Sequence, residues 1–324
     1  MIITPKELQS WIKQGKNFTV FDVRPKKEIK KNPLSKLDSI AGELEEYKEI
    51  KGIVVLVCQI GLVTESMIIQ NELFDTYSLL GGVEAWTNFI KDKNDLSRWS
   101  RQTILDEIGF EGQKKIMNSN VTIIGMGGLG CPAACSLVAS GLGTLKIIDG
   151  DKIEVSNLHR QHLFRERDIG KKKVLSAKKR LESLSEHVSI SAKDIYLNEE
   201  NGYDLIKNSD IIIDASDNIA TRFIIDKLSK KKNIPLVYGA LYKFEGYVSI
   251  FNVNGSKGYS ELYPGKAISS ETCNDAGILG MMPSIIGNMQ ALETIKLIVG
   301  IQPNLVGKLM LYNGLLNTTQ IIEL

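Results

Sequence analysis

The sequence predicts an α/β protein in two parts, a mainly parallel sheet with helices on both faces and a smaller α/β domain before it. Three observations lead to this prediction. Short apolar runs alternate with helical patterns, and a glycine-rich loop follows one such run directly and precedes a helix. The charged stretch from Lys91 to Arg98 has no periodicity and predicts a linker. We place the domains at 1–92 and 98–324, with the linker at 93–97.

Composition excludes several classes of protein. A chain of 324 residues, 43% hydrophobic and 24% charged, can bury the cores of two domains. Its 40 basic and 38 acidic residues leave a charge of +2, unlike a dedicated nucleic-acid binder. The uncharged stretch from Val121 to Leu145 contains six glycines and a proline, so we interpret it as a nucleotide-binding unit and expect no membrane segment. Four cysteines and the lack of a secretory signal favour a cytoplasmic protein.

The first part contains two predicted strands and two predicted helices. Thr19–Arg24 and Ile53–Val57 are rich in β-branched and apolar residues, which indicates buried strands. Pro5–Lys13 and Thr64–Leu73 have helical patterns, and Thr64 is a candidate cap for the second helix.

The second part repeats the pattern on a larger scale. Helical stretches lie between most of its predicted strands, which favours a mainly parallel sheet. Pro283 is tolerated in the first turn of a long helix, Ser284–Val299. The predicted strands are Val121–Ile124, Leu145–Ile148, Val188–Ala192, Ile211–Asp214, Leu236–Tyr238 and Tyr247–Phe251.

The strongest local signal is the loop from Gly125 to Gly130, with the sequence GMGGLG. Its glycines allow a tight turn and a close approach of the backbone to phosphate, and the following helix presents unpaired amides. Asp149 ends the next strand, about twenty residues on, where a carboxylate can hold a ribose hydroxyl. These features predict a Rossmann-like nucleotide site. A nicotinamide-dependent oxidoreductase is one protein that would carry it.

Further polar residues favour a nucleoside triphosphate instead. Arg160 and Lys173 follow the Asp149 strand, and Asp217 and Arg222 follow another buried strand. Open α/β sheets bind ligands at these carboxyl ends of strands. A triphosphate that is to be cleaved needs cations on its departing oxygens and a metal held by an acid.

Several ordered motifs make residues 98–324 resemble the ThiF/MoeB/HesA family of ubiquitin-activating-type adenylyltransferases. They are SRQTIL (100–105), GMGGLGC (125–131), IDGDKIEVSNLHRQ (148–161), the Lys173 helix, DASDNIATR (214–222) and GKLMLYN (307–313).

The resemblance implies a set of site residues. Gly127 and Gly128 would line the phosphates, and Asp149 and Asp151 would mark the ribose end. Asp217 would hold Mg²⁺, and Arg101 would reach the site of a neighbouring subunit, which implies a homodimer. The remaining nucleotide-binding residues would be Asn157, Arg160, Gln161, Lys173 and Asn218.

The implied reaction is ATP-dependent adenylation of the C-terminal glycine of a small ubiquitin-like sulfur carrier that ends in Gly-Gly. A carboxylate is already ionised at neutral pH, so the attack on the α-phosphorus needs no general base. The carrier could belong to the molybdopterin or the thiamine pathway. Two alternatives remain, an NAD-dependent oxidoreductase and a non-catalytic nucleotide-binding scaffold.

The cysteines raise the question of zinc, which family members often hold with two Cys-x-x-Cys pairs. The first pair is replaced here by Gly258–Glu261, and the sequence lacks the second, so we predict no zinc site. Cys131 and Cys135 lie one turn apart on a predicted helix, where packing explains them better than a metal. Cys273 matches a family cysteine that handles sulfur in the thiamine branch, but an exposed cysteine without function would also fit.

Residues 1–92 resemble a rhodanese-like sulfurtransferase domain through FDVR (21–24), the segment after Cys58 and LLGGVEAW (79–86). Cys58 lies between a predicted strand and a helix, where backbone amides lower the pKa of a thiol and can hold a persulfide. It could relay sulfur from a persulfide donor. Val63 stands where arginine is usual, and residues 25–50 lack the usual Gly-His-Ile stretch. The alternative is therefore an inactive domain kept for docking or dimerisation.

Overall fold

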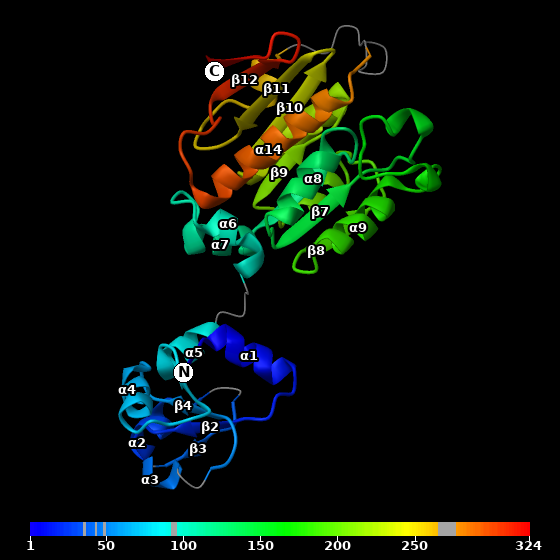
Figure 1. Ribbon diagram of the computed structural model, residues 1–324. Helices are drawn as coiled ribbons and strands as arrows, with labels where there is room; N and C mark the ends of the chain where they lie inside the picture. The colour runs from blue at the N-terminus through cyan, green and yellow to red at the C-terminus, as the bar shows by residue number, and fades with distance from the viewer. Residues whose placement is uncertain (35–36, 43, 48–49, 92–95, 265–276) are drawn as a thin grey trace. The chain divides into compact units, whose positions relative to one another are not determined.

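The computed structural model describes residues 1–34, 37–42, 44–47, 50–91, 96–264 and 277–324. The chain forms two compact units, Met1–Leu96 and Ser97–Leu324 (Figure 1). Each has its own sheet and its own hydrophobic core, so each is described by itself.

The first unit contains a five-stranded sheet in the order β1-β5-β4-β2-β3, and all its pairings are parallel. Its strands are β1 (Ile2–Ile3), β2 (Thr19–Asp22), β3 (Ile40–Ala41), β4 (Val54–Val57) and β5 (Thr76–Leu79). Its helices are α1 (Pro5–Lys13), α2 (Lys26–Lys31), α3 (Leu44–Tyr47), α4 (Leu62–Gln70) and α5 (Gly82–Lys91). All four residues of β4, in the middle of the sheet, are buried.

Local sequence explains where α1 and α4 begin. Thr4 and Glu7 form a capping box around the first turn of α1, which has the predicted bounds. The prediction that Thr64 caps α4 is wrong. The cap is Gly61, at φ +85°, and the Thr64 hydroxyl inside the first turn donates to the Gly61 carbonyl at 2.9 Å. Glycine reaches this backbone conformation without strain, so the helix begins two residues earlier than predicted.

The second unit contains an eight-stranded sheet in the order β13-β12-β11-β10-β9-β6-β7-β8. From β10 to β8 the strands are parallel, and from β10 to β13 each pair is antiparallel. The parallel strands are β6 (Asn120–Ile124), β7 (Thr144–Ile148), β8 (Ser189–Lys193), β9 (Ile211–Asp214) and β10 (Leu236–Tyr242). The others are β11 (Glu245–Phe251), β12 (Lys308–Asn313) and β13 (Thr318–Glu323).

Helices cover both faces of this sheet, which confirms the predicted fold class. Alternate residues of β6 divide between two cores, with Ile123 in one and Ile124 in the other. Helices α8 (Gly130–Ala139), α9 (Lys173–Leu184) and α14 (Met281–Val299) pack on the Ile123 face (Figure 1). Helices α10 (Gly202–Ile206) and α11 (Ile219–Lys232) pack on the other.

Three of the remaining described helical segments precede the glycine loop and three follow it. They are η1 (Leu96–Trp99), α6 (Ser100–Thr103), α7 (Gly109–Asn118), η2 (Val155–Asn157), η3 (Glu166–Asp168) and α12 (Tyr259–Leu262). Helix α14 begins at Met281, so Pro283 lies within its first turn as expected. Among the described residues, no helix combines the length and the apolar character that a membrane crossing requires.

Candidate functional site

The glycine loop connects β6 to α8 at the carboxyl edge of the parallel sheet. Gly125 has φ +98°, and a Cβ there would lie 2.5 Å from the Ala215 carbonyl oxygen of the neighbouring loop. At Gly127 the nearest atom to such a Cβ would be Nε2 of Gln161, 3.7 Å away. Gly125 is therefore required for the close packing of two loops, whereas Gly127 leaves room beside the backbone for a ligand.

Asp149 follows β7 and hydrogen-bonds to the glycine loop and to the turn after β7. Its Oδ2 accepts a hydrogen bond from the Met126 amide, and its Oδ1 accepts one from the Asp151 amide, both at 2.7 Å. Burial raises the pKa of the Asp149 carboxyl above its usual range, against the opposing effect of Lys173. Each carboxylate oxygen has a second lone pair for a ribose hydroxyl.

Lys173 begins α9 and is buried, with 6% of its surface exposed. Its Nζ lies 2.8 Å from Oδ2 of Asp151, and the Tyr196 hydroxyl donates to Oδ1 of Asp151 at 2.6 Å. Burial opposes ionisation of Asp151, but the bonds from Lys173 and Tyr196 prevail and lower its pKa. The result is a buried cation held in place beside the glycine loop.

Residues 157–161 form the next wall of the site. Asn157 is buried, and its Oδ1 accepts the Glu154 amide. The Arg160 guanidinium donates to the Ser156 carbonyl at 2.8 Å. Gln161 is 2% exposed, and its Oε1 has no hydrogen-bond partner among the described residues. A buried amide oxygen without a partner costs free energy, so this one is well suited to a ligand.

Asp217 and Asn218 follow β9 at the same edge. Both are exposed, and Asn218 caps α11 by accepting the Thr221 amide at 2.8 Å. The Arg222 guanidinium donates to the Ser216 carbonyl and to the Tyr238 hydroxyl. Arg222 therefore stabilises the loop after β9 through these hydrogen bonds.

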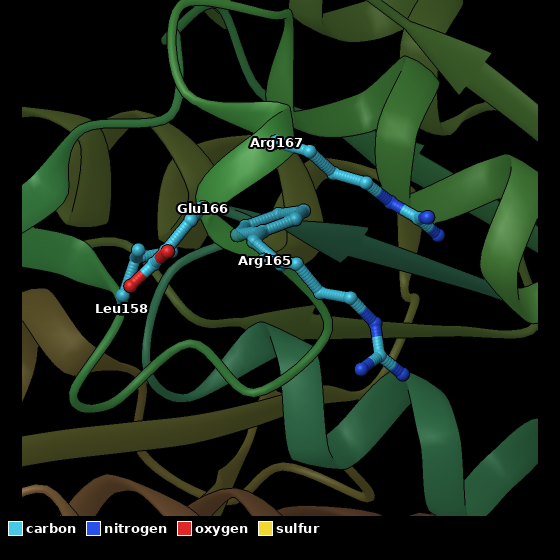
Figure 2. Close-up of a pocket in the computed structure, with 5 residues that line it drawn as sticks. Leu158, Arg165, Glu166 and Arg167 are labelled. Carbon is cyan, nitrogen blue, oxygen red and sulfur yellow. The ribbon is translucent and has the colours of Figure 1, made fainter.

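A shallow pocket of about 540 Å³ lies nearby (Figure 2). Its lining, Leu158 and residues 164–167, includes none of the predicted site residues. Arg165 and Arg167 point to one side of it, and Glu166 points to the other, towards Leu158 (Figure 2). The pocket shares Leu158 with the wall at residues 157–161, but neither the glycine loop nor Asp149, Lys173 or Asp217 lines it.

Comparisons with known proteins identify the family. The family model described as "ThiF family" matches residues 99–324. The chain belongs to the ThiF family. Relatives include the "Adenylyltransferase and sulfurtransferase MOCS3" of Aedes aegypti, 39% identical over 72% of this chain and 54% of that protein. The "Sulfur carrier protein adenylyltransferase" of Thermus thermophilus is 38% identical over 69% of this chain and 85% of that protein.

Solved structures show the same fold. Escherichia coli MccB in complex with MccA-N7isoASN has a TM-score of 0.63 and 21% identity over 74% of this chain and 78% of that one. PaaA has a TM-score of 0.60 and 27% identity over 71% of this chain and 82% of that one. The chain spans about half the length of the MOCS3 relatives it matches.

The segment Gly258–Glu261, where the sequence resemblance raised the question of zinc, contains no cysteine or histidine and does not fit that metal. Instead of thiolates, the Tyr259 and Ser260 amides here donate to the buried carboxylate of Asp226, at 2.9 and 3.0 Å. Among the described residues, no group of three or more His, Cys, Asp or Glu side chains is placed to hold a metal. These hydrogen bonds hold the start of α12 in place.

Cys58 lies in the first unit, between β4 and α4, and is 4% exposed. The Gly61 amide donates to its Sγ at 3.2 Å, and the Thr64 Oγ1 lies 3.6 Å from it. Burial works against the thiolate, but the hydrogen bonds from Thr64, Gly61 and Val63 outweigh it and lower the Cys58 pKa. Compared with an ordinary cysteine, the Cys58 thiolate is therefore stabilised at this junction.

The structure places Arg101 on α6, where it is exposed. Cys273 lies outside the described residues, and one residue near the site was not predicted. Sequence reasoning missed Tyr196, whose only signal is its position three residues after β8 at the carboxyl edge of the sheet.

Proposed function

We propose that this protein uses ATP to adenylate the C-terminal glycine carboxylate of a small ubiquitin-like sulfur carrier. The observation that carries the proposal is the arrangement of Asp149, Lys173 and Gln161 around the open glycine loop. Asp149 can accept a hydrogen bond from a ribose hydroxyl, and Lys173 is a cation fixed by Asp151. The Oε1 of Gln161, at the same edge of the sheet, has no hydrogen-bond partner among the described residues. The names of the relatives support the same reaction.

Positioning and charge are sufficient for this chemistry. An oxygen of the carrier carboxylate attacks the α-phosphorus, the bond to the bridging oxygen breaks, and pyrophosphate leaves. Lys173 and Arg160 would stabilise the negative charge that collects on the departing oxygens. The glycine-loop amides and the start of α8 would hold the phosphates.

The exposed Asp217 carboxylate fits Mg²⁺, because this ion often binds one or two carboxylates together with substrate phosphates and water. When bound, Mg²⁺ would neutralise the charge of the phosphate oxygens. Asn218 would remain the cap of α11 and keep the Asp217 loop in place.

We also propose a homodimer in which Arg101 of each subunit reaches the nucleotide site of the other. Arg101 lies on the short helix α6 and is exposed. An exposed cation of this kind is available to the triphosphate of a partner subunit.

We further propose that the first unit is a rhodanese-like domain and that Cys58 carries sulfur. A persulfide donor would pass its terminal sulfur to the Cys58 thiolate, leaving the donor as a thiol. The persulfide would attack the acyl adenylate, with AMP leaving. A second thiol would then attack the Cys58 sulfur, form a disulfide with it and release the carrier thiocarboxylate.

Exchange of radioactive pyrophosphate into ATP tests the proposal. We expect exchange only when a carrier ending in Gly-Gly is present, and the carrier that supports it identifies the molybdopterin or thiamine pathway. A carrier truncated by its last glycine is the matched control and should support none. ATP binding without exchange for any carrier would instead favour a nucleotide-binding scaffold. Binding of reduced nicotinamide in place of ATP would favour an oxidoreductase.

A further inference from the structure

Tyr196 is an exposed aromatic residue that is held in place beside the nucleotide site. It follows β8 by three residues and is 66% exposed. Its hydroxyl donates to Oδ1 of Asp151 at 2.6 Å. Its ring lies so close to Gly150 that a Cβ there would come within 2.7 Å of two ring atoms. Residue 150 must therefore be glycine for the ring to take this position.

A second interaction fixes the backbone segment that carries the ring. The Lys172 Nζ lies 3.1 Å from Oδ1 of Asp194, two residues before Tyr196, and 3.4 Å from the Gly150 carbonyl oxygen. The segment after β8 is thus tied to the turn after β7. A tyrosine hydroxyl is protonated at neutral pH, and the hydrogen bond to Asp151 raises the pKa of Tyr196 further, to about 12, so it remains a donor. An exposed ring fixed in this way loses little entropy when a ligand packs on it.

Sheet order predicts where a nucleotide base would lie. Strands β6, β7 and β8 are adjacent, and β8 forms the edge of the sheet. The phosphate loop follows β6, and the ribose acceptor Asp149 follows β7. A nucleotide that extends across the carboxyl ends of the strands in this order places its base beyond the ribose, at the end of β8. Tyr196 lies there.

We propose that the Tyr196 ring is the surface on which the base of the bound nucleotide stacks. This inference rests on the proposed function, since it requires a nucleotide at the glycine loop. Stacking of a base on an aromatic side chain contributes binding free energy without selecting one base by hydrogen bonding. The adenylate that remains after pyrophosphate leaves keeps its base and ribose, so the same contact would help to retain it.

Titration calorimetry with ATP and Mg²⁺ tests the affinity. We expect Tyr196→Ala to weaken ATP binding by about tenfold, and Tyr196→Phe, which keeps the ring, to bind within about threefold of wild type. Tyr203→Ala is the matched control, because Tyr203 is also exposed but lies on α10 and contacts Lys232. It should bind ATP as wild type does.

A fluorescent nucleotide tests stacking itself. The fluorescence of 2-aminopurine riboside triphosphate falls when its base stacks, so at saturation the wild type and Tyr196→Phe should quench it and Tyr196→Ala should not. Wild-type ATP affinity in Tyr196→Ala would overturn the inference and leave adenylation standing. Full quenching by Tyr196→Ala would also overturn it, because Tyr196 would then act through Asp151 and Lys173. If the wild type binds neither nucleotide, the proposed function itself fails.

Discussion

Each of the two units contains a strand–loop–helix junction of the same kind, but the side chains around the two junctions differ. In each, a buried parallel strand ends in a glycine-containing loop that leads into a helix: β6 into α8, and β4 into α4. Each junction has backbone amides that can bind an anion. We call Gly125–Gly130 the phosphate junction and Cys58–Thr64 the thiol junction. Around the first stand Asp149, Lys173 and Arg160, whereas the segment Cys58–Thr64 contains no charged residue.

The difference indicates which anion each junction suits. A triphosphate carries several charges and needs cations and a metal. A thiolate or persulfide carries one charge, and the Gly61 amide and the Thr64 hydroxyl lie close to Sγ of Cys58. The neighbouring Ile60, Leu62 and Val63 are exposed. Side chains, rather than backbone, therefore distinguish the proposed nucleotide site from the proposed sulfur site.

We expect the largest effect on pyrophosphate exchange when the acidic side chain beside the phosphate junction is removed. Asp217→Ala should lower pyrophosphate exchange by about a thousandfold, because the carboxylate proposed to hold Mg²⁺ is gone. Its thermal melting should match that of wild type, since the Asp217 side chain is exposed. Asp204→Ala removes another exposed acid, paired with Lys207, and should leave exchange unchanged. Full exchange in Asp217→Ala would show that the metal assignment is wrong.

Substitution of Cys58 should separate sulfur transfer from adenylation. Cys58→Ser should abolish formation of the carrier thiocarboxylate, measured by mass spectrometry with a persulfide donor, because serine cannot carry sulfur. Pyrophosphate exchange should stay at the wild-type rate. Cys135→Ser changes a cysteine on α8 and is the control for loss of a thiol. If Cys58→Ser still forms thiocarboxylate at the normal rate, the first unit has another role.

Two adjacent glycines allow a smaller but sharper test of the phosphate junction. A Cβ at Gly127 meets only the Gln161 amide at 3.7 Å, whereas one at Gly128 would lie 2.8 Å from Cβ of Pro283. Gly127→Ala should therefore fold normally and bind ATP about tenfold more weakly, because the methyl group blocks the approach of phosphate. Gly128→Ala should lower the melting temperature. Calorimetry and thermal melts measure both, and unchanged ATP binding in Gly127→Ala would place the phosphates elsewhere.

Much of the central sheet could be predicted from the sequence. The strands β6, β7 and β9 are short runs of mostly buried and mostly β-branched residues between turn signals, and their observed bounds lie within one residue of the predicted ones. Helix α1 has the predicted bounds because Thr4, Pro5 and Glu7 together specify its start.

Other features lack such signals. Strands β1 and β3 contain two residues each, too few to show a period, and β13 is exposed along its whole length, so it has no alternation. Tyr196 belongs to no motif, and its position depends on a glycine and an acid more than forty residues earlier in the chain. Such contacts between distant residues are visible only in the folded structure.

The smallest expected effect concerns the pH at which the thiol junction ionises. The Cys58 pKa is lowered by its hydrogen bonds despite burial, whereas burial raises the pKa of Cys135. The rate of alkylation by iodoacetamide, followed for each cysteine by peptide mass spectrometry, should therefore reach half its plateau at a lower pH for Cys58. Thr64→Val removes one hydrogen-bonding group and should shift that midpoint upwards. Thr87→Val is the control, because the buried Thr87 hydroxyl bonds to none of the described residues. If alkylation of Cys58 and Cys135 has the same pH midpoint, the amides and the hydroxyl near Cys58 do not stabilise its thiolate. The thiol junction would then not bind an anion as the phosphate junction is proposed to do.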